Sequence, residues 1–253
     1  MFAQNSNLKN QKISDIVGND YRYAKALDSF GVDFYKYFDY QIEDICKIKG
    51  FKKESLIGYR ISLDESFDLE QNSLKSCPLN LVIEYLKHNH NYFIKNKLPY
   101  IKNLIQNLDT SNINYKFSDD LKFIFPLFYE EFTEHIIEEE TIIFEYINKL
   151  FYADHNSQNL SLLFFSMKEI SLKNIAEEHL NEDSEMRGIR GLTKNYSLNN
   201  IKSLHLKVIF QELKEFDKEL EIHSNIENEI LFPRALKLQD KISNELRNVS
   251  FLN

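Results

Sequence analysis

The sequence predicts an all-α protein, and two observations support that prediction. The 253-residue chain contains six Gly and four Pro, too few for the many turns of a β-sandwich or a β-propeller. From Pro78 onward, apolar residues recur at helical spacing over four long stretches, residues 79–108, 118–151, 159–192 and 199–238. Stretches of about 30 residues form helices of about 45 Å, which suits a four-helix bundle. We therefore expect an up-down four-helix bundle preceded by a small helical N-terminal domain.

Composition and charge narrow the class of protein. Acidic residues outnumber basic ones by 39 to 31, and the net charge of −8 disfavours nonspecific binding of nucleic acid. The chain opens with polar residues and has no apolar run near the roughly 18 residues of a membrane helix. We expect no signal peptide, no membrane segment and a cytoplasmic location. Cys46 and Cys77 make no disulfide framework, and we assign them no redox role.

The N-terminal part is expected to form short helices at residues 13–17, 23–30 and 41–49. Gly18, Gly31 and Gly50 separate these pieces and suit turns or helix C-caps. Pro99 lies inside the first long stretch and is expected to bend it without ending it. The predicted organisation is an N-terminal domain, a polar linker, the bundle and a C-terminal tail, at residues 1–62, 63–77, 78–240 and 241–253.

The bundle contains an internal repeat of histidines. In each copy a His is followed four residues later by a Glu, on the same helix face, and nine residues later by a Phe. The first copy has His135, Glu139 and Phe144, and the second has His223, Glu227 and Phe232. A further His precedes each set by 45 and 44 residues, namely His90 and His179. The bundle is therefore predicted to consist of two copies of one helical hairpin.

Four histidines and two carboxylates in a bundle core indicate a pair of metal ions. Imidazole and carboxylate ligands with few sulfurs suit iron or manganese better than copper or zinc. Each carboxylate can bridge the two ions, which leaves two histidines for each ion and open positions for a small ligand. A single His-x-x-x-Glu pair on a Glu-rich helix is more simply a solvated pair. A metal-free helical interaction protein is therefore the competing hypothesis.

Several motifs of the bundle are shared with a known family. They are His90-Asn-Tyr92 before Leu98-Pro99, His135-x-x-x-Glu139, Glu178-His179, Ile189-Arg190-x-Leu-Thr193-x-Asn-Tyr196, and His223-x-x-x-Glu227-Asn228 running into Ile230-Leu231-Phe232-Pro233-Arg234-Ala235-Leu236. On these motifs, residues 79–238 resemble the hemerythrin-like domain of the di-iron family that repairs iron–sulfur clusters after nitrosative or oxidative stress (the Ric/ScdA type).

The resemblance implies two non-haem iron ions, bridged by carboxylates and an oxo group. The ligands that it implies are His90, His135, Glu139, His179, His223 and Glu227, with the two glutamates bridging. It also implies repair of damaged clusters, through iron donation or nitric oxide chemistry, with damaged iron–sulfur proteins, nitric oxide or O2 as partners. A non-enzymatic protein that binds or senses O2 or nitric oxide is the alternative, so the sequence leaves open whether the chain is an enzyme. The long helices can also support a homodimer.

The choice between His88 and His90 and the role of Glu178 each have two interpretations, whereas His155 and His205 have one. His88 and His90 lie roughly 200° apart around a helix, so both cannot face the core, and the His-x-Tyr motif favours His90. Glu178 resembles an acidic residue close to the family's di-iron centre, where it is a candidate catalytic group, but it is equally an exposed neighbour of Glu177. His155, in a polar turn, is expected to be solvated. His205, at the start of the fourth stretch, is expected to be structural.

Residues 13–60 resemble the small N-terminal domain of the same family. The similarity lies in Ser14-Asp-Ile-Val17, in Leu27-Asp-Ser-Phe30-Gly31-Val32-Asp33-Phe34, and in Cys46 and Gly50. The family usually carries a Cys-Cys pair after this run, whereas this chain has Tyr35-Lys36. The departure argues against a thiol function for this domain and leaves docking or dimerisation as its expected role.

Overall fold

A computed structural model of the chain describes residues 8, 10–65, 71–109, 117–155, 163, 166–167, 169–181 and 186–250. Side chains within this part are described except at 64–65, 71–72, 155, 180–181 and 247–250. The described residues form helices joined by turns and irregular segments, and they contain no strand apart from an isolated bridge between Lys12 and Gln41. The all-α prediction is confirmed to that extent. Among the described residues, no helix combines the length and the apolar character needed to cross a membrane.

Contacts within the chain define two compact units, residues 1–68 with 197–212, and residues 69–196 with 213–253. Helix α13 (Leu204–Ile226) contributes its first residues to one unit and the rest to the other. The predicted boundaries assign all of α13 to the bundle. Helical periodicity identifies a continuous helix, but it does not say which neighbours each part of that helix contacts.

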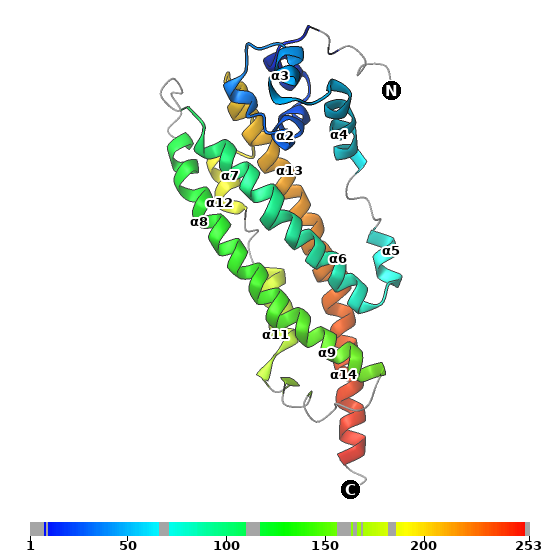
Figure 1. The fold of residues 1–253 in the computed structure, drawn as a ribbon. Coiled ribbons are helices and arrows are strands. Elements are labelled where there is room, and N and C mark those ends of the chain that lie inside the picture. Colours follow the sequence, from blue (N-terminus) through cyan, green and yellow to red (C-terminus); the bar gives the residue numbers. More distant parts are fainter. Residues whose placement is uncertain are drawn as a thin grey trace. The chain divides into compact units, whose positions relative to one another are not determined.

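The first unit is built from short helices (Figure 1), namely α1 (Ile13–Asn19), α2 (Arg22–Ser29), the 3-10 turn η1 (Phe34–Lys36), α3 (Ile42–Lys49) and α4 (Lys53–Glu65). Gly31 and Gly50 follow α2 and α3 with φ of 69° and 76°, the left-handed conformation that the prediction of turns and C-caps requires. The predicted break at Gly18 is wrong, because α1 continues through it to Asn19 and only the following residue, Asp20, has an extended backbone.

His205 belongs to the core of the first unit. It is 5% exposed, and its ring stacks on that of Tyr35 at 4.3 Å between centroids and 5° between planes. The ring of Phe34 meets the same His205 edge-on at 5.6 Å. The expectation of a structural role for His205 is consistent with this packing. The side chain of His155 lies outside the described residues.

Two helices lie in the segments that the sequence analysis assigned to a linker and to a C-terminal tail. Helix α5 (Gln71–Ser76) lies inside the predicted linker, of which residues 66–70 fall outside the described part. Helix α14 (Phe232–Ser250) continues through most of the predicted C-terminal tail. Leu74 and Ile242 anchor these two helices with 4% and 0% exposure. One or two buried residues in a polar stretch give a weak hydrophobic period, which explains why the sequence prediction missed both.

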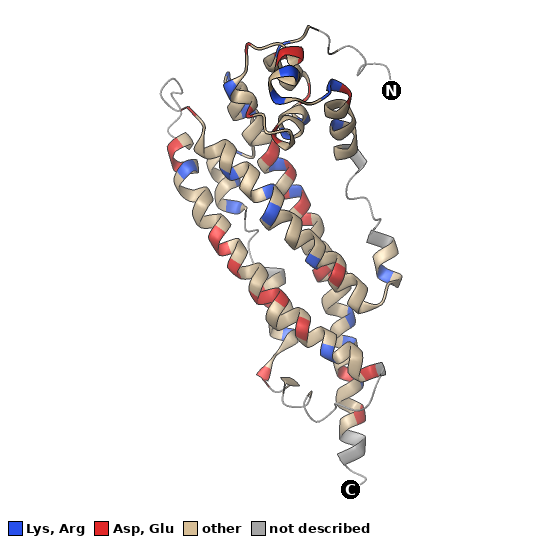
Figure 2. Cartoon of the chain, viewed as in Figure 1, with Lys and Arg blue, Asp and Glu red and all other residues tan. Residues whose placement is uncertain are grey.

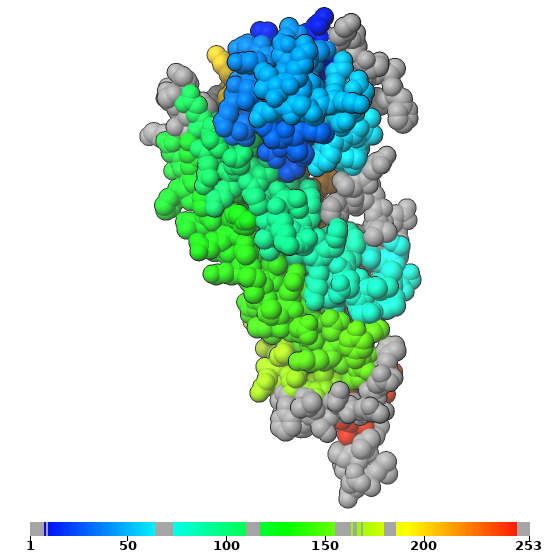
Figure 3. Space-filling model, in the orientation of Figure 1, coloured from blue at the N-terminus to red at the C-terminus, as the bar shows by residue number. Residues whose placement is uncertain are grey.

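The second unit is built from long helices interrupted by π-helical turns (Figure 1). These are α6 (Leu79–Tyr92), η2 (Phe93–Lys97) and α7 (Leu98–Gln106); then α8 (Phe117–Glu138), η3 (Glu139–Phe144) and α9 (Glu145–His155); then α11 (Leu172–Asn181) and α12 (Arg187–Leu192); and finally the end of α13, η5 (Glu227–Leu231) and α14. Helix α7 packs on α8, α6 packs on α9, and both α9 and α11 pack on α14. On the face drawn in Figure 3, side chains of α6–α9 close into a continuous surface.

Two π-helical turns end two residues before a proline. In η2 the N–H of Leu98 donates to the carbonyl of Phe93, five residues back, and η5 closes in the same way. Pro99 follows η2 and Pro233 follows η5 with one residue between. Because proline has no N–H, the α-helical hydrogen-bond ladder is already open at these points. The helix adapts to Pro99 by a widened turn, and the helical run continues past it.

Candidate metal centre

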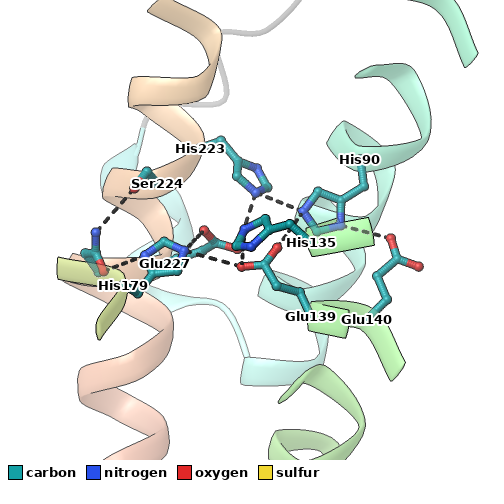
Figure 4. Close-up of polar contacts among 9 residues, drawn as sticks. His90, His135, Glu139, Glu140, His179, His223, Ser224 and Glu227 are labelled. Atoms are coloured by element: carbon teal, nitrogen blue, oxygen red, sulfur yellow. Dashed lines mark hydrogen bonds and ion pairs between the residues drawn. The ribbon is translucent and has the colours of Figure 1, made fainter. Parts of the chain in front are cut away.

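All six predicted metal ligands converge in the second unit (Figure 4). They form two groups that could hold metal ions, and the ligand atoms of each group lie within 4.8 Å of one another. The first group consists of His90, Glu139, His223 and Glu227, and the second of His135, Glu139 and His179. Of the two candidates on α6, the structure brings His90 into the cluster and leaves His88 exposed.

Glu139 turns one oxygen toward each group. Its Oε2 lies 3.4 Å from Nε2 of His90, whereas its Oε1 lies 3.4 Å from Nε2 of His135 and 3.3 Å from Nε2 of His179. This carboxylate begins η3, four residues after His135, so the i,i+4 spacing puts both side chains on the same side of the helix.

Glu227 does the same from the other hairpin. Its Oε1 lies 3.3 Å from Nε2 of His223, and its Oε2 lies 3.2 Å from Nε2 of His179. Glu227 begins η5, at the same offset from His223 as Glu139 has from His135. Each histidine pair therefore faces one oxygen of each carboxylate, which is the arrangement that two bridging carboxylates require.

The cluster fits metal ions better than it fits a self-contained hydrogen-bond network. Oε1 of Glu139 and Oε1 of Glu227 are buried and have no hydrogen bond of ordinary geometry, although ring nitrogens stand close to both. In the described part of the chain, the ion-pair partners of these carboxylates are all histidines. Two carboxylates with 2% and 1% exposure are costly to bury without a full positive partner. A divalent cation between the oxygens and the ring nitrogens would supply that charge.

The first histidine pair is aligned for metal binding. Nε2 of His90 and Nε2 of His223 lie 2.9 Å apart, so both nitrogens are directed into one small space. Burial lowers the pKa of His90, and the neighbouring His223 lowers it further. The neutral imidazole that results is the form that binds a metal ion.

The electrostatics of the carboxylates favour their charged forms. Burial acts to raise the pKa of Glu227, but the rings of His223 and His179 outweigh it and the pKa is lowered. The pKa of Glu139 is lowered for the same reason, by His135 and His179 against burial. Burial would lower the pKa of His179, yet the two carboxylates beside it raise that pKa to about 11. Without metal, the centre therefore holds a proton on His179, and a metal ion must displace it.

The residue after Glu139 and the residue after Glu227 each support a histidine of the same hairpin. Oε1 of Glu140 accepts from Nδ1 of His90 at 2.9 Å. Oδ1 of Asn228 accepts from Nδ1 of His179 at 3.1 Å, and its Nδ2 donates to Oγ of Ser224 at 3.3 Å. A hydrogen on Nδ1 leaves the lone pair of Nε2 directed at the metal position. The internal repeat thus extends to the residues that hydrogen-bond the candidate ligand histidines.

Aromatic rings of Phe144 and Phe232 cover the centre. The ring of Phe144 lies parallel to that of His90 at 5.6 Å, and the ring of Phe232 lies edge-on to that of His179 at 5.3 Å. Nine residues of unbroken α-helix, at about 100° each, would turn each Phe about 180° away from the ligand histidine on its own helix. The π-helical turn between them absorbs one residue, which brings both side chains to the core.

The two histidine pairs differ in access to solvent. The side chains of His90 and His223 are 1% and 7% exposed, whereas those of His179 and His135 are 11% and 31% exposed. Helix α8, which carries His135, is also lined with acidic side chains (Figure 2). The acidic side chains of that helix would attract a cation, and the His135–His179 pair is the more accessible of the two pairs.

A buried lysine, which the sequence analysis missed, ties two ligand-bearing segments together. Lys97 of η2 is 4% exposed, and its Nζ lies 3.3 Å from Glu219 and 3.8 Å from Glu215 of α13. Glu219 precedes His223 by one helical turn. A single Lys in a helical stretch gives no signal of burial. Glu140 and Asn228, in contrast, could have been found, because each follows a repeated Glu by one residue.

Glu178, the predicted candidate for a catalytic group, is exposed and belongs to neither of the two groups. Its role stays a prediction.

Comparison with protein-family models and with curated protein sequences finds no match to this chain. The resemblance to the hemerythrin-like family therefore rests on the motifs given above.

Proposed function

We propose that this chain is a hemerythrin-like, non-haem di-iron protein that acts in the cytoplasm in the repair of iron–sulfur clusters damaged by nitrosative or oxidative stress. In this proposal the long helical segments of the second unit form an up-down four-helix bundle. The observation that supports the metal centre most strongly is that Glu139 and Glu227 each turn one oxygen toward each histidine pair. The motifs shared with the family support cluster repair as the task.

The donor set determines which residues would hold the two ions. His90 and His223 would hold one, His135 and His179 the other, and the two glutamates both. Nitrogen and oxygen donors without sulfur suit iron or manganese. When bound, two ferrous ions would supply the two electrons that, with two protons, convert two molecules of nitric oxide to N2O and water.

The protein's own side chains would control access and protonation. The partly exposed His135 lies where a small ligand or a leaving metal ion would pass. Phe144 and Phe232 keep water from the buried side of the centre. Glu140 accepts a hydrogen bond from Nδ1 of His90 and so orients that ring.

A second candidate function is reversible binding or sensing of O2 or nitric oxide without turnover. The observation that favours it is the aromatic shield, to which Phe93 and Phe132 also belong, with ring centroids 5.7 Å from His223 and 6.4 Å from His135. An apolar shield protects a bound diatomic ligand from protons. Stable oxygenation in air would favour this candidate, and rapid oxidation would favour repair.

The test begins with the full chain purified without oxygen and loaded with ferrous iron. We expect two iron ions per chain and near-ultraviolet absorption that develops in air. The loaded protein should then restore activity to a [4Fe–4S] enzyme that nitric oxide has damaged, whereas the Glu227→Ala variant should not. Failure to retain iron after anaerobic loading would contradict the metal centre. Retained iron without any recovery of the damaged enzyme would contradict the repair function.

A further inference from the structure

We infer that the two metal positions are unequal in affinity, and that Glu140 makes the His90–His223 position the tighter one. This inference rests on the proposed metal centre and specifies how its two halves differ. Glu140 acts here as a positioning residue, since it contacts a ligand and not the metal position itself.

The internal repeat allows the residues that support the two metal positions to be compared directly. His135, Glu139 and Phe144 each have a residue of the same type 88 residues later, and the positions after the glutamates are 88 residues apart as well. At those positions the chain has Glu140 in one hairpin and Asn228 in the other. Both accept a hydrogen bond from Nδ1 of a ligand histidine, at 2.9 and 3.1 Å. The two halves are thus supported in the same way, by a carboxylate in one and by a neutral amide in the other.

A carboxylate strengthens a histidine ligand more than an amide does. The negative charge of Glu140 draws the Nδ1 hydrogen and increases the electron density that Nε2 of His90 offers to a cation. It also adds a negative charge close to that metal position. Asn228 fixes the orientation of His179 without either effect, and one of its amide hydrogens is already donated to Ser224.

Burial acts in the same direction. His90 and His223 are nearly inaccessible, so the attraction between their ring nitrogens and a cation is stronger in that low-dielectric environment. Glu140 itself is 34% exposed, and its contact with His90 lies at the edge of this buried region. His135 is 31% exposed, so water competes for the metal at the other position. The structure therefore assigns the His135–His179 position as the one that exchanges its ion with solvent or with a client protein.

The experiment is a titration of the metal-free full chain with Co2+, followed by calorimetry and by visible absorption. Wild-type protein should bind two ions in two steps. His135→Ala should abolish the weaker step and keep the tighter one. Glu140→Gln should weaken the tighter step by about 10- to 100-fold and leave the other step unchanged. The matched variant Asn228→Asp, which introduces the carboxylate in the other half, should tighten the weaker step.

The outcomes separate this inference from the proposed function. If Glu140→Gln changes neither step, or weakens both equally, the inference is wrong although the metal centre stands. The same holds if His135→Ala removes the tighter step, or if Asn228→Asp fails to tighten the weaker one. If wild-type protein binds no Co2+, the metal centre itself is contradicted. A purely structural role of Glu140 would not predict opposite effects from the two isosteric variants.

Discussion

The two hairpins of the second unit are alike in their candidate metal ligands. They differ in the residues that hydrogen-bond those ligands. Each supplies two histidines, one glutamate and one phenylalanine whose ring lies against a histidine. Behind these, Glu140 stands in one hairpin where Asn228 stands in the other, and the two histidine pairs differ in exposure. We therefore expect the repeated ligand set to bind two ions of one kind with different affinities.

The largest effect should come from removing a group that both halves share. Glu139→Ala deletes an oxygen from each metal position, so we expect loss of both ions. The decrease in metal affinity should exceed the roughly 100-fold that is typical of removing a residue that only hydrogen-bonds a metal ligand. Iron content and Co2+ titration measure this. His135→Ala is the comparison, since it should remove one ion only. If Glu139→Ala keeps two ions, the carboxylate does not bridge.

Metal binding should stabilise the folded protein. A ligand that binds only the native state at about 100 times its dissociation constant adds about 2.7 kcal/mol. We expect the thermal midpoint of the wild-type chain to rise on addition of Co2+ and that of Glu227→Ala to stay constant. Differential scanning calorimetry measures both. An equal rise in the two proteins would mean that Co2+ binds elsewhere.

Equivalent histidines should respond to pH in opposite ways in the metal-free protein. His90 has a lowered pKa because of burial, whereas the carboxylates raise the pKa of His179 to about 11. Since an unfolded histidine titrates near pH ~6.5, the contribution of His179 is complete below that pH and is lost as pH rises through about 11. Urea denaturation at about pH 6 and about pH 10 should show this loss in wild type and less of it in His179→Gln. His90→Gln should keep the loss, and an unchanged His179→Gln profile would contradict the assignment.

The smallest effect tests the π-helical turn that follows His90. The hydroxyl of Tyr129 donates to the carbonyl of Ile94 in η2 at 3.0 Å. Tyr129→Phe should lower the free energy of unfolding by about 1 kcal/mol, the usual value of one such hydrogen bond. Chemical denaturation measures it, with Tyr152→Phe at a 58% exposed position as the control. Equal stability of the two variants would show that this bond does not support the turn.

The sequence predicted the helical class and the convergence of the six side chains, because the i,i+4 spacing and the internal repeat fix which residues share a helix face. It also led to His90 over His88. The π-helical turns were not predicted, although the sequence contains a signal for them. A Phe nine residues after a His faces the same core only if a π-helical turn between them absorbs one residue. Lys97 and the helix in the predicted tail were missed because a few buried residues in polar surroundings leave no periodic pattern.

Anomalous diffraction from crystals grown with ferrous iron tests the central claim most directly. Two iron peaks should appear, one beside Nε2 of His90 and His223 and one beside Nε2 of His135 and His179, with Glu139 and Glu227 between them. The second peak should be lost first as the iron concentration is lowered. A single peak, or peaks away from these side chains, would contradict a carboxylate-bridged pair of metal ions.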